Sequence, residues 1–573
     1  MSVRVFVVII ATWLGLAPAA IQAASHQPVG AENGMVVSAH RLASDTGVEV
    51  LKAGGNAVDA AVAVAYALAV TFPEAGNIGG GGFMTIRLAD GREAFIDFRE
   101  TAPLAATATM FQDKAGNVIP GLSTRSFKAV GVPGTVAGLE LARERYGTRP
   151  RAELIEPAVR LARDGFVLDH ADAEFLSRGA EDFARDPAAR AIFLNNGQPW
   201  RAGERLVQAD LGRMLAAIAA GGPDAFYRGE AARLIVAASK AQGGIMAMKD
   251  FETYRAKERP PLTCSYRGYR IISAPPPSSG GTVICQTLGI LEGYDLGKLG
   301  FHSADAVHVT VEALRRAYRD RNLELGDPDF ITVDLERLLS PAYIARLRAG
   351  IDPARATPST TLGGPAVLKE GKSTTHFSVV DKAGNGVSLT YTLNDWFGAR
   401  IVAAGTGILL NNEMDDFSAK PGSPNMYKLV EGPNNAVAPG KRPLSSMSPT
   451  IVTRDGKLEL VLGTPGGSRI PTGVLQVMMN VIDHGMTLTE AVDAPRIHAQ
   501  WLPDSISAER FALSAETAAV LRAKGHVLES MGFWNQIAAI KVGTPGGDLP
   551  TRGAQRYYGA IDPRLPTGSV AGY

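Results

Sequence analysis

The sequence predicts an α+β fold, because both hairpins and amphipathic helices can be identified in one continuous chain. Residues 83–88 and 93–98 flank Ala-Asp-Gly-Arg, and residues 451–453 and 457–462 flank Arg-Asp-Gly. Short strands on either side of a turn that contains Asp-Gly are typical of β-hairpins. We therefore expect antiparallel sheets, with helices layered on them.

Helical periodicity follows Ser303, a candidate N-cap, where apolar residues recur at spacings of four, three and four: Val307, Val311, Leu314 and Tyr318. Residues 471–483 are apolar on every side, which predicts a helix buried between layers. The Pro-rich residues 274–281 could be an interdomain linker. We interpret them as a tight internal loop, because strand and helix patterns resume on either side.

The composition excludes several classes of protein. The chain has 573 residues, of which 46% are hydrophobic, and 58 Lys and Arg against 57 Asp and Glu leave a net charge of +1. This balance gives no electrostatic basis for binding nucleic acid or an anionic membrane. The histidines form no His-Glu-x-x-His motif, so we predict no metal and no cofactor. We interpret Cys264 and Cys285 as buried thiols, although two cysteines allow one disulfide.

The N-terminal segment resembles a secretory signal peptide. Arg4 precedes an apolar run over residues 5–16, and small residues follow up to Ala24. We expect residues 1–23 to be removed and the mature protein to be exported, to the periplasm or the medium. The apolar run is too short to span a bilayer, as is the later run 60–72, so no membrane span is expected in the mature form.

Residues 374–394 predict a hairpin whose register has a well-defined parity, while shifts by two residues stay open. If residues 381–385 form the loop, Val380 pairs with Gly386, and Thr374 then lies opposite Thr392. Thr374, His376, Ser378, Ser388, Thr390, Thr392 and Asn394 share one face, and the other face is almost entirely apolar. Taken alone, such a hairpin is most simply half buried, with its Ser and Thr residues facing water.

Further motifs in the sequence weaken this interpretation of the hairpin. They are Asp97-Phe-Arg-Glu100, residues 407–417 (Gly-Ile-Leu-Leu-Asn-Asn-Glu-Met-Asp-Asp-Phe), Lys441-Arg-Pro-Leu-Ser-Ser-Met-Ser-Pro449 and Gly463-Thr-Pro-Gly-Gly-Ser-Arg469. Together with Gly79-Gly-Gly-Gly-Phe83, they give a chain that resembles the gamma-glutamyltransferases of the N-terminal nucleophile hydrolase superfamily. The resemblance runs from about residue 33 to residue 573.

The resemblance implies a precursor that cleaves itself between Ser373 and Thr374. The large subunit would comprise residues 24–373 and the small subunit residues 374–573. The two subunits would form a heterodimer that shares a four-layer αββα fold. The sequence departs from the family pattern at Asp395-Trp396, and at Glu413, where many bacterial members have Gln. Both departures bear on acceptor preference.

The catalytic residues that the resemblance implies are Thr374, Thr392, Gly466 and Gly467. A freed Thr374 would supply both the nucleophilic hydroxyl and, through its α-amine, the base. Thr392 would fix the hydroxyl by a hydrogen bond. Gly466 and Gly467 lie in a turn between a strand and a helix, where their amides could stabilise an oxyanion. We interpret His376 as structural.

A γ-glutamyl donor carries an α-carboxylate and an α-ammonium group, which require opposite charges in a buried site. The resemblance assigns the carboxylate to Arg99, Ser445 and Ser446, and the ammonium group to Glu413, Asp416 and Asn394. Residues 421–427 resemble the lid of many members, with Tyr427 closing over the pocket; a plain surface loop is nearly as good an interpretation.

The function so implied is an exported γ-glutamyltransferase and glutathione hydrolase, with water, amino acids or peptides as acceptors. One alternative is a cephalosporin or glutaryl acylase on the same scaffold. Asp416 argues against it, because a glutaryl chain has no ammonium group. The other alternative is an exported solute-binding protein, which would not need a free Thr374.

Overall fold

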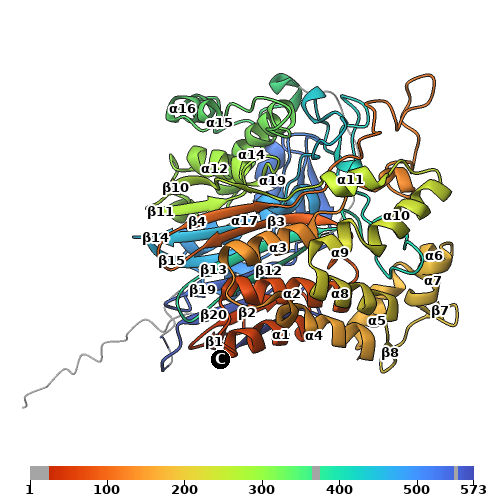
Figure 1. Ribbon diagram of the computed structural model, residues 1–573. Coiled ribbons are helices and arrows are strands. Elements are labelled where there is room, and N and C mark those ends of the chain that lie inside the picture. The colour runs from red at the N-terminus through yellow and green to blue at the C-terminus, as the bar shows by residue number, and fades with distance from the viewer. Residues whose placement is uncertain (1–24, 364–373, 534, 547–550, 552) are drawn as a thin grey trace, which may run out of the picture.

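The computed structural model describes residues 25–363, 374–533, 535–546, 551 and 553–573. Within this part of the chain, two seven-stranded antiparallel sheets form the centre of the molecule (Figure 1). In spatial order, the first sheet contains β1 (Val29–Ala31), β20 (Tyr557–Ile561), β19 (Ala538–Val542), β15 (Lys457–Gly463), β14 (Thr450–Arg454), β11 (Tyr269–Ser273) and β10 (Leu262–Tyr266). The second contains β21 (Ser569–Gly572), β2 (Met35–Ser38), β12 (Thr375–Val380), β13 (Gly386–Thr392), β3 (Gly81–Arg87), β4 (Glu93–Asp97) and β9 (Lys257–Arg259).

Helices cover the outer face of each sheet, which completes a four-layer αββα sandwich (Figure 1). The second sheet is covered by α1 (Arg41–Lys52), α2 (Ala57–Thr71) and α3 (Thr135–Tyr146), with α4 (Arg151–Asp164) and α8 (Ala209–Gly221) packed outside them. The first sheet is covered by α12 (Gly280–Leu291), α17 (Ile470–Ile482) and α18 (Leu488–Asp493), with α14 (Ala304–Glu324) packed on α12. The prediction of an α+β fold of the αββα type is confirmed.

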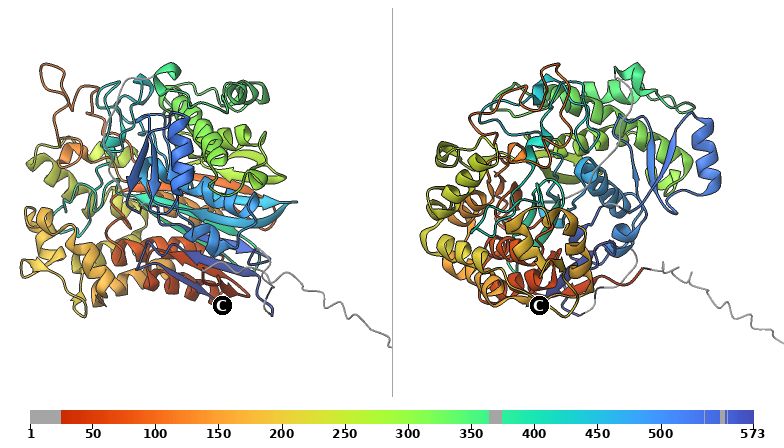
Figure 2. Two further views of the ribbon diagram at one scale, coloured as in Figure 1. Left: turned by 180° about the vertical axis from the view of Figure 1, so that it is seen from behind. Right: turned by 90° about the vertical axis from the view of Figure 1, so that its right-hand side faces the viewer.

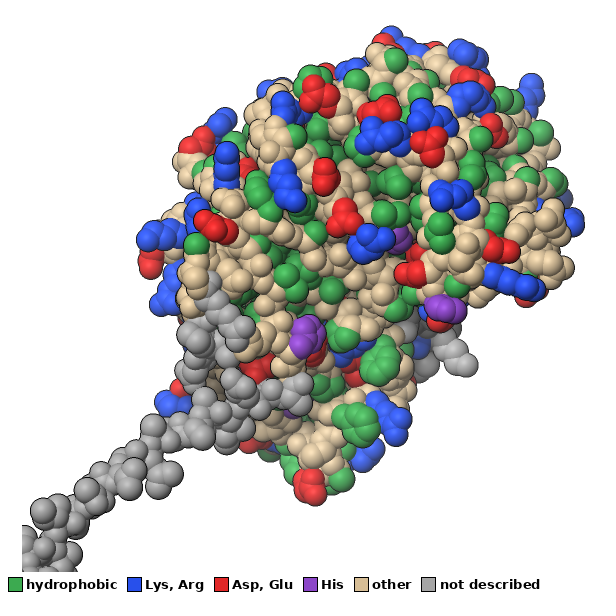
Figure 3. Space-filling view, turned by 90° about the horizontal axis from the view of Figure 1, so that it is seen from below, with side chains coloured by type: hydrophobic (Ala, Val, Ile, Leu, Met, Phe, Trp, Pro, Cys, Tyr) green, Lys and Arg blue, Asp and Glu red, His purple; other side chains and the backbone are tan. Residues whose placement is uncertain are grey.

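Both ends of the described chain enter these sheets. β1 pairs with β20 and β2 pairs with β21, so strands from the beginning and the end of the sequence lie side by side (Figure 2). Among the residues described, none of the helices has the length and apolar character needed to cross a membrane. Over the face shown in Figure 3, acidic and basic side chains are interspersed, in keeping with the near-zero net charge.

The local predictions hold at each element. Ser303 caps α14 by accepting a hydrogen bond from the Ala306 amide, and nearly all of α17 is buried. The loop between β11 and α12 is buried throughout, as expected for an internal loop. In the hairpin of β12 and β13, Val380 pairs with Gly386 and Thr375 with Tyr391, which confirms the predicted register.

The polar face of this hairpin does not face water. Ser378 donates to the Ala538 carbonyl and Ser388 to the Leu462 carbonyl, which are both in the first sheet. The apolar face packs against α2. The simple half-buried interpretation is therefore wrong, because the polar side chains hydrogen-bond the opposite sheet inside the sandwich.

The interpretation of both cysteines as free thiols is also wrong. Cys264 in β10 and Cys285 in α12 form a disulfide with a Cα–Cα distance of 5.8 Å. The chain passes from β10 through β11 and then returns over β10 as α12, which packs on that strand. This return places two residues that are 21 positions apart within bonding distance.

Candidate active site

The site is built at the end of the β12–β13 hairpin, where the two sheets meet several loops. Thr374 directly precedes β12, and Thr392 ends β13. The Oγ1 atoms of the two threonines are 3.4 Å apart, and Thr374 is only 7% exposed. Thr392 Oγ1 also accepts a hydrogen bond of 2.7 Å from the Asn394 amide. The predicted opposition of Thr374 and Thr392 is confirmed, and the Thr374 hydroxyl is held beside a fixed polar partner.

Gly466 and Gly467 lie in the turn between β15 and α17. Their φ angles are 136° and 56°, in the region that favours glycine. A Cβ atom at Gly467 would overlap the ring of Tyr427, and one at Gly466 would crowd the Asn535 amide. Both glycines are therefore required by the backbone path. Gly467 lines the same cavity as Thr374, and Gly466 lines a second pocket that Thr374 also reaches.

We call the first of these spaces the inner cavity. It encloses about 20 Å³ and is strongly charged. Its walls are formed by Arg99, Arg321, Thr374, Thr392, Asn394, Glu413, Asp416, Tyr427, Leu429, Ser445, Ser446, Met447, Gly467, Ser468 and Ile470. Ten of the eleven residues predicted for the site thus line one cavity, and the exception is Gly466.

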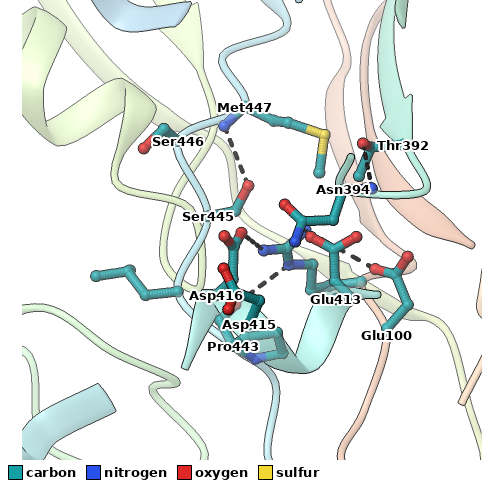
Figure 4. A network of polar contacts seen from close by, with 12 residues as sticks. Glu100, Thr392, Asn394, Glu413, Asp415, Asp416, Pro443, Ser445, Ser446 and Met447 are labelled. Carbon is teal, nitrogen blue, oxygen red and sulfur yellow. Dashed lines mark hydrogen bonds and ion pairs between the residues drawn. The ribbon is translucent and has the colours of Figure 1, made fainter. Parts of the chain in front are cut away.

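Three carboxyl groups surround Arg99 at the inner cavity. Arg99 is fully buried and forms ion pairs with both Glu413 and Asp416, and its Nη1 lies 3.8 Å from Glu100 Oε2. Figure 4 shows Glu100, Glu413 and Asp416 converging on this point. Burial raises the pKa of Glu100 to about 7 although Arg99 opposes the shift, and burial raises the pKa of Glu413 well above its usual range. One guanidinium group is thus shared by three carboxyl groups, and an added cation would stabilise their ionised forms.

The serines lie in the loop that faces these carboxylates (Figure 4). Ser445 Oγ accepts a hydrogen bond of 3.1 Å from the Met447 amide, and Ser446 Oγ accepts one of 3.4 Å from Arg321. Asn394 donates its side-chain amide to the Asn412 carbonyl at 3.0 Å.

Tyr427 closes one wall of the cavity. Its hydroxyl donates to the Asn394 carbonyl at 2.5 Å, and the side chain is buried. The cavity has room for about one water molecule and not for a glutamyl group. Its wall must therefore shift for such a donor to enter.

Sequence reasoning missed Arg321, which lines the cavity, and Glu100, which lies beside Arg99. Glu100 adjoins Arg99 in a motif already recognised. Arg321 follows Tyr318 by three residues and so continues the apolar stripe of α14, where a charged residue is unexpected; it pairs with the buried Glu431. A charge on an apolar stripe was the available signal.

His376 has the structural role expected of it. Nδ1 lies 2.8 Å from Thr390 Oγ1 and Nε2 lies 3.1 Å from Ser378 Oγ, in a fully buried position. Burial lowers the pKa of His376 to about 3, so the ring is neutral. Within the described residues, no group of His, Cys, Asp and Glu side chains is arranged to hold a metal ion.

We call the second space the outer pocket. It encloses about 320 Å³ and also reaches Thr374. Its described walls are formed by Phe72, Glu74, Phe175, Arg178, Thr374, Trp396, Pro465, Gly466, Phe533, Asn535, Gln536 and Arg564. Thr374 therefore borders both a small charged cavity and a larger pocket with several aromatic side chains.

A four-layer αββα sandwich with a threonine at the head of a central strand defines the class of N-terminal nucleophile hydrolases. A solved structure of a cephalosporin acylase from Bacillus halodurans superposes with a TM-score of 0.83 at 27% identity, over 97% of this chain and 99% of that chain. The particular family follows from the sequence. The chain belongs to the gamma-glutamyltranspeptidase family, whose model matches residues 43–572.

Relatives of two kinds resemble the chain over most of its length. The glutathione hydrolase proenzyme of Pseudomonas sp. (strain A14) is 58% identical over 99% of this chain and 98% of its own length. The acylase ACY 1 proenzyme of Pseudomonas sp. (strain V22) is 42% identical over 91% of this chain and 92% of its own length. The chain is therefore an enzyme of this family, and the alternative of a solute-binding protein is wrong.

Proposed function

We propose that the chain is a self-cleaving precursor of an exported γ-glutamyltransferase and glutathione hydrolase, with Thr374 as its nucleophile. The observation that carries the proposal is the position of Thr374, which precedes β12 beside Thr392 and lines both the inner cavity and the outer pocket. The higher identity to a glutathione hydrolase proenzyme than to an acylase supports this choice of reaction.

Maturation requires the Thr374 hydroxyl to attack the carbonyl of Ser373, which lies outside the described residues. The ester so formed is hydrolysed, and the products are a large subunit of residues 24–373 and a small subunit that begins with Thr374. The two subunits remain associated, because β12 and β13 of the small subunit pair with β2 and β3 of the large one.

In acylation, the freed α-amine of Thr374 accepts the hydroxyl proton as Oγ1 attacks the γ-amide carbonyl of the donor. The bond from Oγ1 to carbon forms, the bond from carbon to nitrogen breaks, and the proton passes to the leaving amine. The amides of Gly466 and Gly467 stabilise the oxyanion, and Thr392 holds Oγ1 in place. Water or an acceptor amine then releases the glutamyl group.

The donor is recognised by exchange of ion pairs in the inner cavity. In the absence of ligand, Arg99 is paired with Glu413 and Asp416. A zwitterionic glutamyl group can insert between them: its carboxylate takes Arg99 together with Ser445 and Ser446, and its ammonium group takes the two carboxylates and Asn394. Each charge keeps a partner. Tyr427 moves to admit the donor and then closes over it.

The predicted signal peptide, residues 1–23, lies outside the described residues. Export is supported by one feature of the structure. The disulfide between Cys264 and Cys285 is of the kind that persists in oxidising compartments such as the periplasm.

The test is N-terminal sequencing of the purified protein, combined with donor assays. We expect two chains of about 350 and 200 residues, the smaller of which begins at Thr374, and release of Cys-Gly from glutathione. Thr374→Ala should remain one chain and be inactive. Cleavage of Thr374→Ala at the same bond, or an active wild type that is never cleaved, would refute the mechanism.

The acylase alternative is tested with the same protein. The likeness to a cephalosporin acylase and to acylase ACY 1 motivates it. A glutaryl group would leave the excess carboxylates of the inner cavity without a cation, which costs binding free energy. We therefore expect a γ-glutamyl anilide to be cleaved in preference to a glutaryl anilide, and the reverse preference would favour the acylase.

A further inference from the structure

The outer pocket contains a pair of ionisable side chains, Glu74 and Arg178, that the acylation step does not use. Glu74 follows α2, Arg178 follows α5 (His170–Ser177), and both line the pocket together with Thr374. Arg178 Nη1 lies 3.8 Å from Glu74 Oε1. The pair therefore faces the same space from which an amine must leave Thr374 in acylation or approach it in transfer.

Glu74 has an unused buried oxygen. Its side chain is 6% exposed, and Oε2 has no hydrogen-bond partner in the part of the chain that the structure describes. The position of Glu74 is fixed, because its carbonyl accepts a hydrogen bond of 2.8 Å from the Phe397 amide. An unpaired carboxylate oxygen in a buried place is costly unless a ligand supplies a donor.

Arg178 lies over two aromatic rings. Its guanidinium carbon lies 4.3 Å from the centre of the Phe175 ring and 4.9 Å from that of Trp396. Its side chain is 30% exposed, and it donates one hydrogen bond of 3.1 Å to the exposed Glu174. Stacking orients the planar group and leaves further N–H donors at its edge, the arrangement that suits a carboxylate.

We propose that the outer pocket binds the amine partner of the reaction as a zwitterionic amino acid or short peptide, with its carboxylate on Arg178 and its ammonium group on Glu74. This inference rests on the proposed function, since it names the site of the leaving group and of the acceptor. It assigns to Glu74 and Arg178 a role in choosing acceptors.

The transfer step then balances. The bound ammonium group gives one proton to the Glu74 carboxylate and becomes a neutral amine. The amine attacks the glutamyl ester, the amide bond forms, the bond from the ester carbon to Thr374 Oγ1 breaks, and a second proton from nitrogen passes to Oγ1. Glu74 afterwards releases its proton to solvent. Burial raises the pKa of Glu74 to about 8, close to the usual 7.7 to 8.0 of an α-amine, so proton exchange between them is nearly even.

The experiment measures hydrolysis and transfer with a γ-glutamyl anilide as donor. The acceptors are glycylglycine and its amide, glycylglycinamide, which lacks the carboxylate. For Arg178→Gln, we expect the KM for glycylglycine to rise roughly 10- to 100-fold, the loss typical of a charge-assisted hydrogen bond, while the KM for the amide stays within about threefold. For Glu74→Gln, transfer to both acceptors should fall by at least about tenfold relative to hydrolysis.

Matched controls are available on the neighbouring helix α6 (Ala180–Phe183) and just beyond it. Arg185 and Glu181 pair with each other, are 68% and 86% exposed, and are not among the residues that line the pocket. Arg185→Gln and Glu181→Gln should leave hydrolysis and transfer unchanged.

Two results would overturn the inference. The first is an equal rise in the KM of both acceptors for Arg178→Gln, and the second is a loss of hydrolysis as large as the loss of transfer for Glu74→Gln. Either result would make these residues structural. A failure of the proposed function looks different, because the wild type would then release no aniline from the γ-glutamyl donor at all.

Discussion

The inner cavity and the outer pocket both border Thr374 and differ in how their charges are held. In the inner cavity, Arg99 is fully buried and paired with two carboxylates. In the outer pocket, Arg178 is partly exposed, lies over two aromatic rings, and pairs with the exposed Glu174 at 3.1 Å and with the buried Glu74 at 3.8 Å. The inner cavity encloses about 20 Å³ and the outer pocket about 320 Å³.

This difference explains how one nucleophile can combine strict recognition of the donor with broad recognition of the amine. A tight cavity with fixed ion pairs accepts one charged group, because any other ligand leaves a buried charge unpaired. A wide pocket with a stacked guanidinium group fixes a carboxylate and leaves room for different side chains. The donor is thus recognised in the inner cavity, and the amine in the outer pocket.

The largest expected effect comes from the two arginines. Arg99→Met should lower the free energy of unfolding by roughly 3 to 5 kcal/mol, because it leaves buried carboxylates without a partner. Arg178→Met should cost less than about 1 kcal/mol, since its ion pair with Glu74 is long and its ion pair with Glu174 is exposed. Denaturant titration of both variants measures the contrast. Should Arg99→Met not fold, Arg99→Lys retains the charge and should recover part of the loss. Equal losses in the free energy of unfolding for Arg99→Met and Arg178→Met would contradict the proposed difference between the two sites.

Asp416→Asn tests the inner cavity through its chemistry. The substitution keeps the shape and removes a charge that we assign to the donor ammonium group. Loss of one partner from a buried pair costs roughly 2 to 5 kcal/mol, so kcat/KM for a γ-glutamyl anilide should fall on the order of 30-fold to several thousandfold. The kcat/KM for a glutaryl anilide should stay the same or rise. Equal losses of kcat/KM for the two donors would show that Asp416 supports the fold and does not bind the ammonium group of the donor.

The disulfide provides a reference away from both pockets. Joint replacement of Cys264 and Cys285 by Ser opens a loop with a sequence separation of 21 and should cost about 3 kcal/mol of stability. The ratio of transfer to hydrolysis should stay the same, because neither cysteine lines either space. A changed ratio in the folded double variant would mean that general loosening alters the pockets, and the pocket variants would then need reinterpretation.

The sequence predicted the inner cavity better than the outer pocket, for a physical reason. The parity of the β12–β13 register follows from a two-residue period, and the assumed five-residue loop at 381–385 then placed Thr392 opposite Thr374, as observed. The resemblance then supplied Arg99, Glu413, Asp416 and the serines.

Glu74 and Arg178 carry no such pattern. Each follows the end of a helix, and the pair forms only when α2 and α5 are placed in space. The disulfide was not predicted for the same reason, since a strand and the helix that returns over it must pack before the cysteines meet.

The smallest expected effect concerns Glu74 and depends on pH. Burial raises its pKa from 4.5 to about 8, with Asp395 adding to the shift and Arg178 opposing it. Between these two pH values, the unfolded chain has lost the proton while the native protein retains it, so the native state binds more protons and its stability falls as pH rises. Glu74→Gln removes this penalty. It should raise the free energy of unfolding by roughly 1 to 3 kcal/mol at pH 8, and by much less at pH 5.

The measurement is the difference between Glu74→Gln and wild type in denaturant titrations at the two pH values, with the exposed Glu181→Gln as the control that should show none. A gain of the same size at pH 5 and pH 8 would contradict the raised pKa. If the variant is more stable and yet slower in transfer, the unpaired carboxylate is retained at a cost in stability because the acceptor amine needs it, as expected of a binding residue.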